Sequence, residues 1–166
     1  MRWLGSVLYW GMVLLLFVFM FNIMGHCQET PIYCQADVVK AMKDIWSEAG
    51  NGMTGVESSF IVDGTPQAYV IMHEKHTGEK MSQSVIVHRN VTFALFHVHP
   101  NGGGMWPSTP QNNYMGNGLG DTGFADKVGF DIYVVSRSGL TVYSPKTRQM
   151  MIVRQGLDWS KTKGCQ

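Results

Sequence analysis

The segment TFALFHVHP, residues 92–100, constrains the fold more than any other part of the chain. Its β-branched, aromatic and apolar residues predict a strand, and Pro100 ends that strand because proline has no N–H for a strand ladder. Side chains alternate between the two faces of a strand, so His97 and His99 lie on one face at its tip. Two imidazoles placed in this way can converge on one metal ion, although two half-buried histidines that bind nothing fit the same pattern.

A long segment rich in glycine, proline and asparagine follows this strand, over residues 100–120. Loops of this length in compact domains are usually functional or disordered, and sites commonly form where a strand opens into a loop. A catalytic zinc ion needs a third protein ligand and an open position for water. We therefore expect the third ligand in this loop or in the helix after it.

The region before the first strands predicts one amphipathic helix. Apolar residues recur at three- and four-residue spacing, which is typical of a helix packed on a sheet. These residues are Val38, Val39, Met42, Ile45, Trp46 and Ala49. Gly50 and Gly52 end the helix.

The remaining pattern predicts strands, turns and one short helix. Residues 56–72 indicate two strands joined by a turn at Asp63–Gly64, or by one that runs on through Pro66. Another strand is expected over residues 82–87. After the loop, GDTGFADKVG predicts a short helix ended by Gly129, and FDIYVVS, LTVYS and QMMIVR predict a three-stranded meander. This order of elements indicates an α+β fold, with α/β as the related alternative.

The size and charge of the chain limit its organisation and its partners. The 166 residues, 45% of them hydrophobic, suit one small domain with extra segments. The formal net charge is +1 and no basic or acidic block occurs. We therefore expect no nucleic-acid partner.

The first residues predict a targeting segment. Arg2 precedes an apolar run over residues 7–24, and Gly25 and Cys27 supply small residues before Gln28. This arrangement is typical of a cleaved secretory signal peptide over residues 1–27, which predicts an exported protein, periplasmic or secreted. The run, at about 18–20 residues, is also long enough to remain as a membrane anchor.

Cysteine usage agrees with export. If cleavage removes Cys27, then Cys34 and Cys165 remain near the two ends of the mature chain. In an oxidising compartment such a pair predicts a disulfide that closes a loop of about 130 residues. Two unrelated thiols are the alternative.

Several motifs in this order resemble the JAB/MPN metallopeptidase superfamily, also called JAMM. FHVHP is followed by PS, by an Asp that opens a short helix and by IYVVSRSGLTVYSP, and the likeness is greatest to secreted bacterial JAB-like domains. The resemblance covers roughly residues 55–157. It implies a cytidine-deaminase-like JAB fold, with a mixed β-sheet flanked by an N-terminal helix and by a short helix after the metal loop. Residues 28–54 would form the N-terminal helix region, and residues 158–166 a C-terminal tail.

The resemblance implies that His97 and His99 bind Zn²⁺ together with Asp121. The family pattern has its Asp three residues after a Ser, whereas Asp121 follows Ser108 by thirteen. We therefore expect an insertion of about ten residues between them. Asp126 is the rival ligand, and Asp121 as a plain helix N-cap is the alternative role.

The family's general base is a Glu on an early strand, and Glu57 fits that place. Glu74 is the alternative. A Glu near a metal-activated water would take its proton and pass it to the leaving amine. Ser108 would donate to the oxyanion, although loop capping suits it equally.

Together these expectations describe an exported zinc-dependent JAB-like metallopeptidase or isopeptidase. It would hydrolyse an amide bond in a peptide or isopeptide substrate, with the cell envelope as one source. A catalytically inactive JAB-fold binding module at the cell envelope is the alternative. A membrane-anchored structural domain, in which the histidines only pack, is a third.

Overall fold

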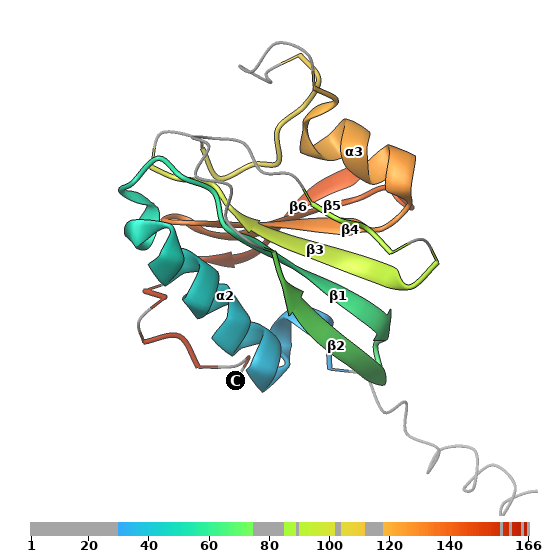
Figure 1. Cartoon of the computed structure of the whole chain (residues 1–166). Helices are drawn as coiled ribbons and strands as arrows, with labels where there is room; N and C mark the ends of the chain where they lie inside the picture. The colour runs from blue at the N-terminus through green and yellow to red at the C-terminus, as the bar shows by residue number, and fades with distance from the viewer. Residues whose placement is uncertain are drawn as a thin grey trace, which may run out of the picture. The chain divides into compact units, whose positions relative to one another are not determined.

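The structure is a computed structural model of the chain (Figure 1). It describes residues 30–74, 85–88, 90–101, 104–111, 118–156, 158–159, 161–163 and 165. Contacts divide the chain into Met1–Thr30 and Pro31–Gln166, and every described helix and strand belongs to the second unit. The predicted signal peptide or anchor lies outside the described residues. No helix within the described ranges has both the length and the apolar character needed to cross a membrane.

Six strands form one mixed sheet in the order β2-β1-β3-β4-β5-β6 (Figure 1). They are β1 (Ser59–Thr65), β2 (Ala68–His73), β3 (Thr92–Val98), β4 (Asp131–Ser136), β5 (Gly139–Ser144) and β6 (Gln149–Gln155). Only the pairing of β3 with β4 is parallel among these neighbours. A parallel pair needs a crossover connection, and this one contains the long loop and helix α3 (Gly120–Val128). The α+β class and the predicted meander β4-β5-β6 are confirmed.

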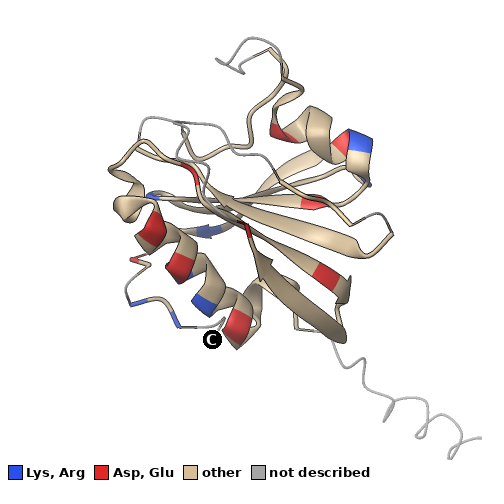
Figure 2. Cartoon of the chain, viewed as in Figure 1, with Lys and Arg blue, Asp and Glu red and all other residues tan. Residues whose placement is uncertain are grey.

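Helix α2 (Ala36–Glu48) is the predicted amphipathic helix, and it lies between the 3₁₀ turns η1 (Ile32–Cys34) and η2 (Gly50–Gly52). Its apolar stripe is buried against the sheet, as the spacing predicts. The buried helical residues are Val38, Val39, Ala41, Met42, Ile45 and Trp46. Figure 2 shows acidic residues on the surfaces of α2 and α3, while most of the length of the strands carries no charged residue.

The alternation of side chains gives the sheet two different covered faces. Phe60, Phe96 and Tyr133 stack across β1, β3 and β4 on the α2 side, with ring centroids 4.7 Å and 4.3 Å apart. Leu95 and Ile132 belong to the opposite face, where they pack with residues of α3. His97 follows Leu95 by two residues, so it shares the α3 face. The sheet therefore lies between two helical layers, and the histidines face the shorter helix.

The predicted hairpin turn at Asp63–Gly64 is wrong in its position. Both residues lie inside β1, and the turn falls at Pro66–Gln67, in the longer loop that the sequence left open. Asp63 is buried, and its two carboxylate oxygens lie 2.5 Å from Thr92 Oγ1 and from His88 Nδ1. These tertiary contacts override the local preference of Asp-Gly for a turn.

The strand expected over residues 82–87 is absent where the structure describes that segment. Residues 85–87 adopt no strand, and residues 82–84 lie outside the described ranges. Val85 and Val87 instead pack as half-buried side chains in the core on the α3 side. The alternating apolar residues of this segment are therefore explained by the contacts of Val85 and Val87 with the core, and not by a strand.

A disulfide joins Cys34, in η1, to Cys165, in the C-terminal tail, across a separation of 131 residues. The same tail contributes Trp159, which is buried and whose Nε1 donates to the Ser136 carbonyl at 2.8 Å. The tail is thus held at both of these points to the sheet and the N-terminal turn. The disulfide is the pairing that the sequence predicts.

Reduction of the disulfide should destabilise the fold strongly. Closing a loop of this length removes entropy from the unfolded chain, so we expect the free energy of unfolding to fall by about 2–5 kcal/mol. Urea unfolding with and without dithiothreitol measures this change. A Cys34→Ala/Cys165→Ala variant should show the lower stability and no response to the reductant, whereas an unchanged midpoint on reduction would contradict the bond.

Candidate metal site

Backbone hydrogen bonds fix the tip of β3 on both sides. The Val98 N–H donates to Ser58 O on the β1 side, and the His99 N–H donates to Val135 O on the β4 side, both at 2.9 Å. Beyond Pro100, the Asn101 N–H donates to Gly52 O at 2.7 Å. The strand end that carries the two histidines is therefore anchored to three neighbouring elements.

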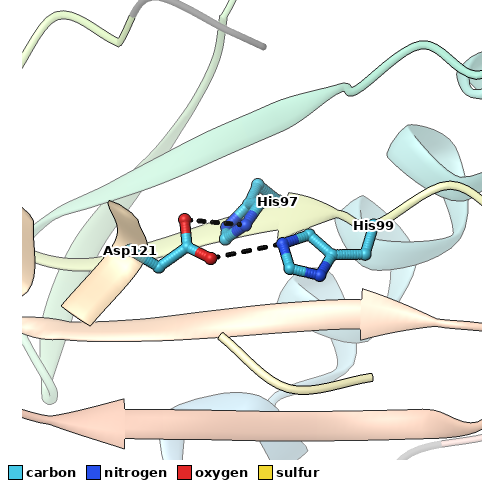
Figure 3. Close-up of side chains that lie close together, drawn as sticks. All are labelled: His97, His99 and Asp121. Carbon is cyan, nitrogen blue, oxygen red and sulfur yellow. Dashed lines mark hydrogen bonds and ion pairs between the residues drawn. The ribbon is translucent and has the colours of Figure 1, made fainter. Parts of the chain in front are cut away.

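Asp121, in the first turn of α3, reaches both histidines with its carboxylate (Figure 3). Its Oδ1 lies 3.3 Å from His97 Nε2, and its Oδ2 lies 3.2 Å from His99 Nε2. One ligand atom from each residue lies within 4.8 Å of the others. Ligands at about 2.0–2.1 Å from a tetrahedral zinc ion are separated by roughly 3.3–3.4 Å, so these spacings suit a shared metal.

The two imidazoles contain buried nitrogen atoms without hydrogen-bond partners among the described residues. These atoms are Nδ1 of His97 and Nδ1 of His99, whereas Nε2 of His97 lies 3.3 Å from Asp121 Oδ1. A buried polar group left unpaired costs about 1–3 kcal/mol, so a second role for these atoms is expected. Two imidazoles and one carboxylate form a donor set that zinc accepts, with one position left for water or substrate. This buried group fits a divalent metal ion.

Ser108 holds the Asp121 carboxylate from the loop. Its backbone N–H and its hydroxyl donate to Asp121 Oδ2 at 2.6 Å and 2.9 Å, and its Oγ accepts from the Asp121 N–H at 2.9 Å. The single hydroxyl hydrogen is therefore directed at the third ligand. The oxyanion role of Ser108 stays a prediction. It requires that the hydroxyl leave Asp121 Oδ2 and donate to the oxyanion instead.

Gly120 allows the two ends of the predicted insertion to meet. It has a φ of 62°, and a Cβ at this position would lie 2.7 Å from the Thr109 carbonyl carbon. Glycine has no Cβ and tolerates this conformation. The approach places Ser108 against Asp121 although the chain separates them by 13 residues.

Two acidic residues are alternatives in the sequence, Asp126 as the third ligand and Glu74 as the base. Asp126 Oδ1 accepts a hydrogen bond from the Tyr143 hydroxyl at 2.9 Å. Glu74 follows β2, where its N–H donates to Ser59 O at 3.1 Å. Asp126 does not belong to the group that could hold a metal ion, and the choice between Glu57 and Glu74 as the base stays a prediction.

Glu57 precedes β1 by two residues and interacts electrostatically with all three members of the group. Ser59 pairs with His97 in the antiparallel register of β1 and β3, and Glu57 shares the face of Ser59 by alternation. Burial raises the pKa of the Glu57 carboxyl, His97 and His99 lower it, and Asp121 raises it, with a net increase. The role of Glu57 as a general base stays a prediction.

Charges within the group shift the pKa values of its members in opposite directions. Burial lowers the pKa of His97, but the Asp121 carboxylate and Glu57 outweigh it, so the pKa lies above its usual value. Burial raises the pKa of Asp121, yet His97 and His99 hold it well below its usual value. Asp121 therefore stays anionic, while a proton competes for His97.

One contact that positions the loop has no sequence signal. The Thr141 hydroxyl, buried in β5, donates to the Met105 carbonyl at 2.5 Å across 36 residues. The contact holds the loop over the face that carries the histidines. Thr141 is near Met105 because β5 pairs with β4, which lies beside the strand that leads into the loop.

Comparisons with protein-family models, with curated proteins and with solved structures find no match to this chain. The likeness to the JAB/MPN superfamily therefore stays an expectation from sequence motifs. The function is inferred from the geometry of the site.

Removal of Asp121 should weaken zinc binding strongly. Loss of partners outside the first ligands already costs about 10–100-fold in metal affinity, so we expect at least about 100-fold for Asp121→Ala. Asp126→Ala is the matched control, because it removes a carboxylate of the same helix that bonds only Tyr143 among the described contacts. Competition titration with a fluorescent chelator measures both affinities, and equal losses would contradict the assignment.

Zinc affinity should fall as the pH falls. A metal needs the neutral imidazole, and the pKa of His97 lies above its usual value, so a proton competes with the metal at this residue more than at an ordinary histidine. Affinity should be full above that pKa and decline below it, because binding then releases a proton. Titrations at pH 8 and pH 5.5 test this, and a pH-independent affinity would contradict it.

Proposed function

We propose that the protein is an exported, zinc-dependent metallopeptidase or isopeptidase of the JAB type that hydrolyses an amide bond. The observation that carries this proposal is the convergence of two buried histidines and Asp121 with Glu57 acting on the same group. The mixed sheet, with a helix on each face and the histidines at a strand tip, supports the cytidine-deaminase-like JAB fold.

His97, His99 and Asp121 would hold the ion. When bound, Zn²⁺ would polarise the substrate carbonyl and lower the pKa of a water molecule to about 7. Asp121 keeps a negative charge in the group, and Ser108 holds that carboxylate toward the two imidazoles. The ligand set is thus fixed before substrate binds, which is how a preorganised site acts.

Glu57 would move the proton. A carboxylate oxygen of Glu57 accepts the proton of the attacking water, and the resulting carboxyl group donates it to the leaving amine. Burial raises the pKa of Glu57, which favours holding the proton between these two steps.

Exposed apolar side chains near the site suit a polypeptide substrate. Met53, Trp106 and Leu119 are 76%, 43% and 46% exposed, and the last two stand two residues before Ser108 and Asp121. Exposed apolar side chains beside a site would give the apolar side chains of a peptide contacts that exclude water. Peptide or isopeptide substrates, those of the cell envelope among them, offer side chains to such a surface.

The disulfide supports the exported location in this proposal. Disulfides persist in oxidising compartments and are rare in the cytosol, and Cys34 and Cys165 form one here. An exported peptidase would act on amide bonds outside the cytosol.

A catalytically inactive JAB-fold binding module is the second candidate. It is favoured by the Ser108 hydroxyl, whose hydrogen is directed at Asp121, leaving the expected oxyanion donor engaged. In that case zinc would order the site for a ligand, and Glu57 would have no proton to move.

Glu57→Gln separates the two candidates. A general base contributes about 10²–10⁴-fold, so we expect hydrolysis to fall by that factor while zinc affinity is kept. Quenched fluorescent peptide libraries and lysine isopeptides are the substrates to use. Glu48→Gln is the control, since Glu48 is exposed and accepts only the Ser58 hydroxyl in the contacts described. Zinc-loaded protein that cleaves none of these substrates would favour the binding module.

A further inference from the structure

Ser59 and His97 are cross-strand neighbours, and each has a buried side-chain polar atom without a hydrogen-bond partner among the described residues. They are paired in the register of β1 with β3, so their side chains stand beside each other on the α3 face. Ser59 is completely buried and His97 is 5% exposed. Ser59 Oγ and His97 Nδ1 have no hydrogen-bond partner among the described residues. Two buried orphan atoms on adjacent positions point to a shared role.

If His97 binds a metal ion, its second ring nitrogen needs a hydrogen-bond acceptor. Nε2 of His97 faces Asp121, so Nδ1 is the nitrogen that carries hydrogen when Nε2 binds a metal. A ligating histidine nearly always donates this second N–H to an acceptor, which fixes the tautomer and the ring orientation. Strand β3 is paired on both sides, so its neighbours' backbone carbonyls already serve the ladders. A side-chain hydroxyl is the acceptor this position provides.

We propose that Ser59 is the positioning residue for the metal ligand His97, with Ser59 Oγ accepting a hydrogen bond from His97 Nδ1, directly or through one water molecule. The inference rests on the proposed metal site. Cross-strand Cβ atoms lie about 4.5–5.5 Å apart, a distance that a serine rotamer change or a single water bridges. That bond would give the buried Ser59 hydroxyl a hydrogen-bond partner.

The neighbouring Ser58 provides a matched comparison. It is as fully buried as Ser59, but alternation directs it to the other face, where its Oγ donates to Glu48 Oε2 at 2.5 Å. It therefore has a partner and no access to His97. Comparing Ser58→Ala with Ser59→Ala therefore separates the general effect of removing a buried hydroxyl here from a specific effect on His97.

Zinc affinity and stability should change in opposite senses in Ser59→Ala. We expect zinc affinity to fall about 10–100-fold, while the metal-free protein unfolds at the same or a higher urea concentration, because an unpaired hydroxyl has been removed. Ser58→Ala should keep the zinc affinity of the wild type. The isosteric pair Ser59→Thr and Ser59→Val should differ, with the hydroxyl-bearing variant binding zinc more tightly.

The imidazole signals of His97 give a readout that packing alone does not move. In ¹⁵N-edited spectra of the zinc-loaded wild type, Nδ1 should carry the hydrogen in a slowly exchanging bond, and Ser59→Ala should lose that protection. Unchanged zinc affinity with unchanged His97 signals in Ser59→Ala overturns the inference alone. Equal zinc affinities in the Thr and Val variants also overturn it. A wild type that binds no zinc overturns the proposed function, and this inference with it.

Discussion

The interaction between the Asp121 carboxylate and two strand histidines organises one face of this protein. It joins the first turn of α3 to the tip of β3, which are brought together by the parallel pairing of β3 with β4. A partly buried carboxylate needs partners, and here it receives two imidazoles and the N–H and hydroxyl of Ser108. Loop, helix and strand tip therefore depend on one another.

The alternation of side chains gives the two faces of the sheet different sets of residues. An apolar core lies on the α2 side of the sheet. It contains the stacked rings of Phe60, Phe96 and Tyr133 and the apolar stripe of α2. On the other side, the same strands present His97 and its neighbours to the short helix. Strand β3 thus carries core residues on one face and His97 on the other, and it is paired along both edges.

Features that depend on neighbours in the sequence could be predicted, and those that depend on distant register could not. The α2 stripe, the meander and the shared face of His97 and His99 follow from periodicity alone. Asp63–Gly64 misled because buried contacts with His88 and Thr92 hold it in a strand. The role of Ser108 toward Asp121, and the pairing of Ser59 with His97, arise only after loop closure and strand pairing.

The close approach at Gly120 has a consequence for how this site can vary. Because Gly120 lies against Ser108 and Thr109, the chain leaves the site and returns to it at nearly the same point. The entropy of closing a loop grows only slowly with its length, so residues added or removed between these ends would shift the free energy little. The two ends of the loop are held together at Ser108, Thr109 and Gly120. The position of Asp121 therefore depends little on the number of residues between those ends. The number of residues in the loop can therefore vary while Ser108 stays against Asp121.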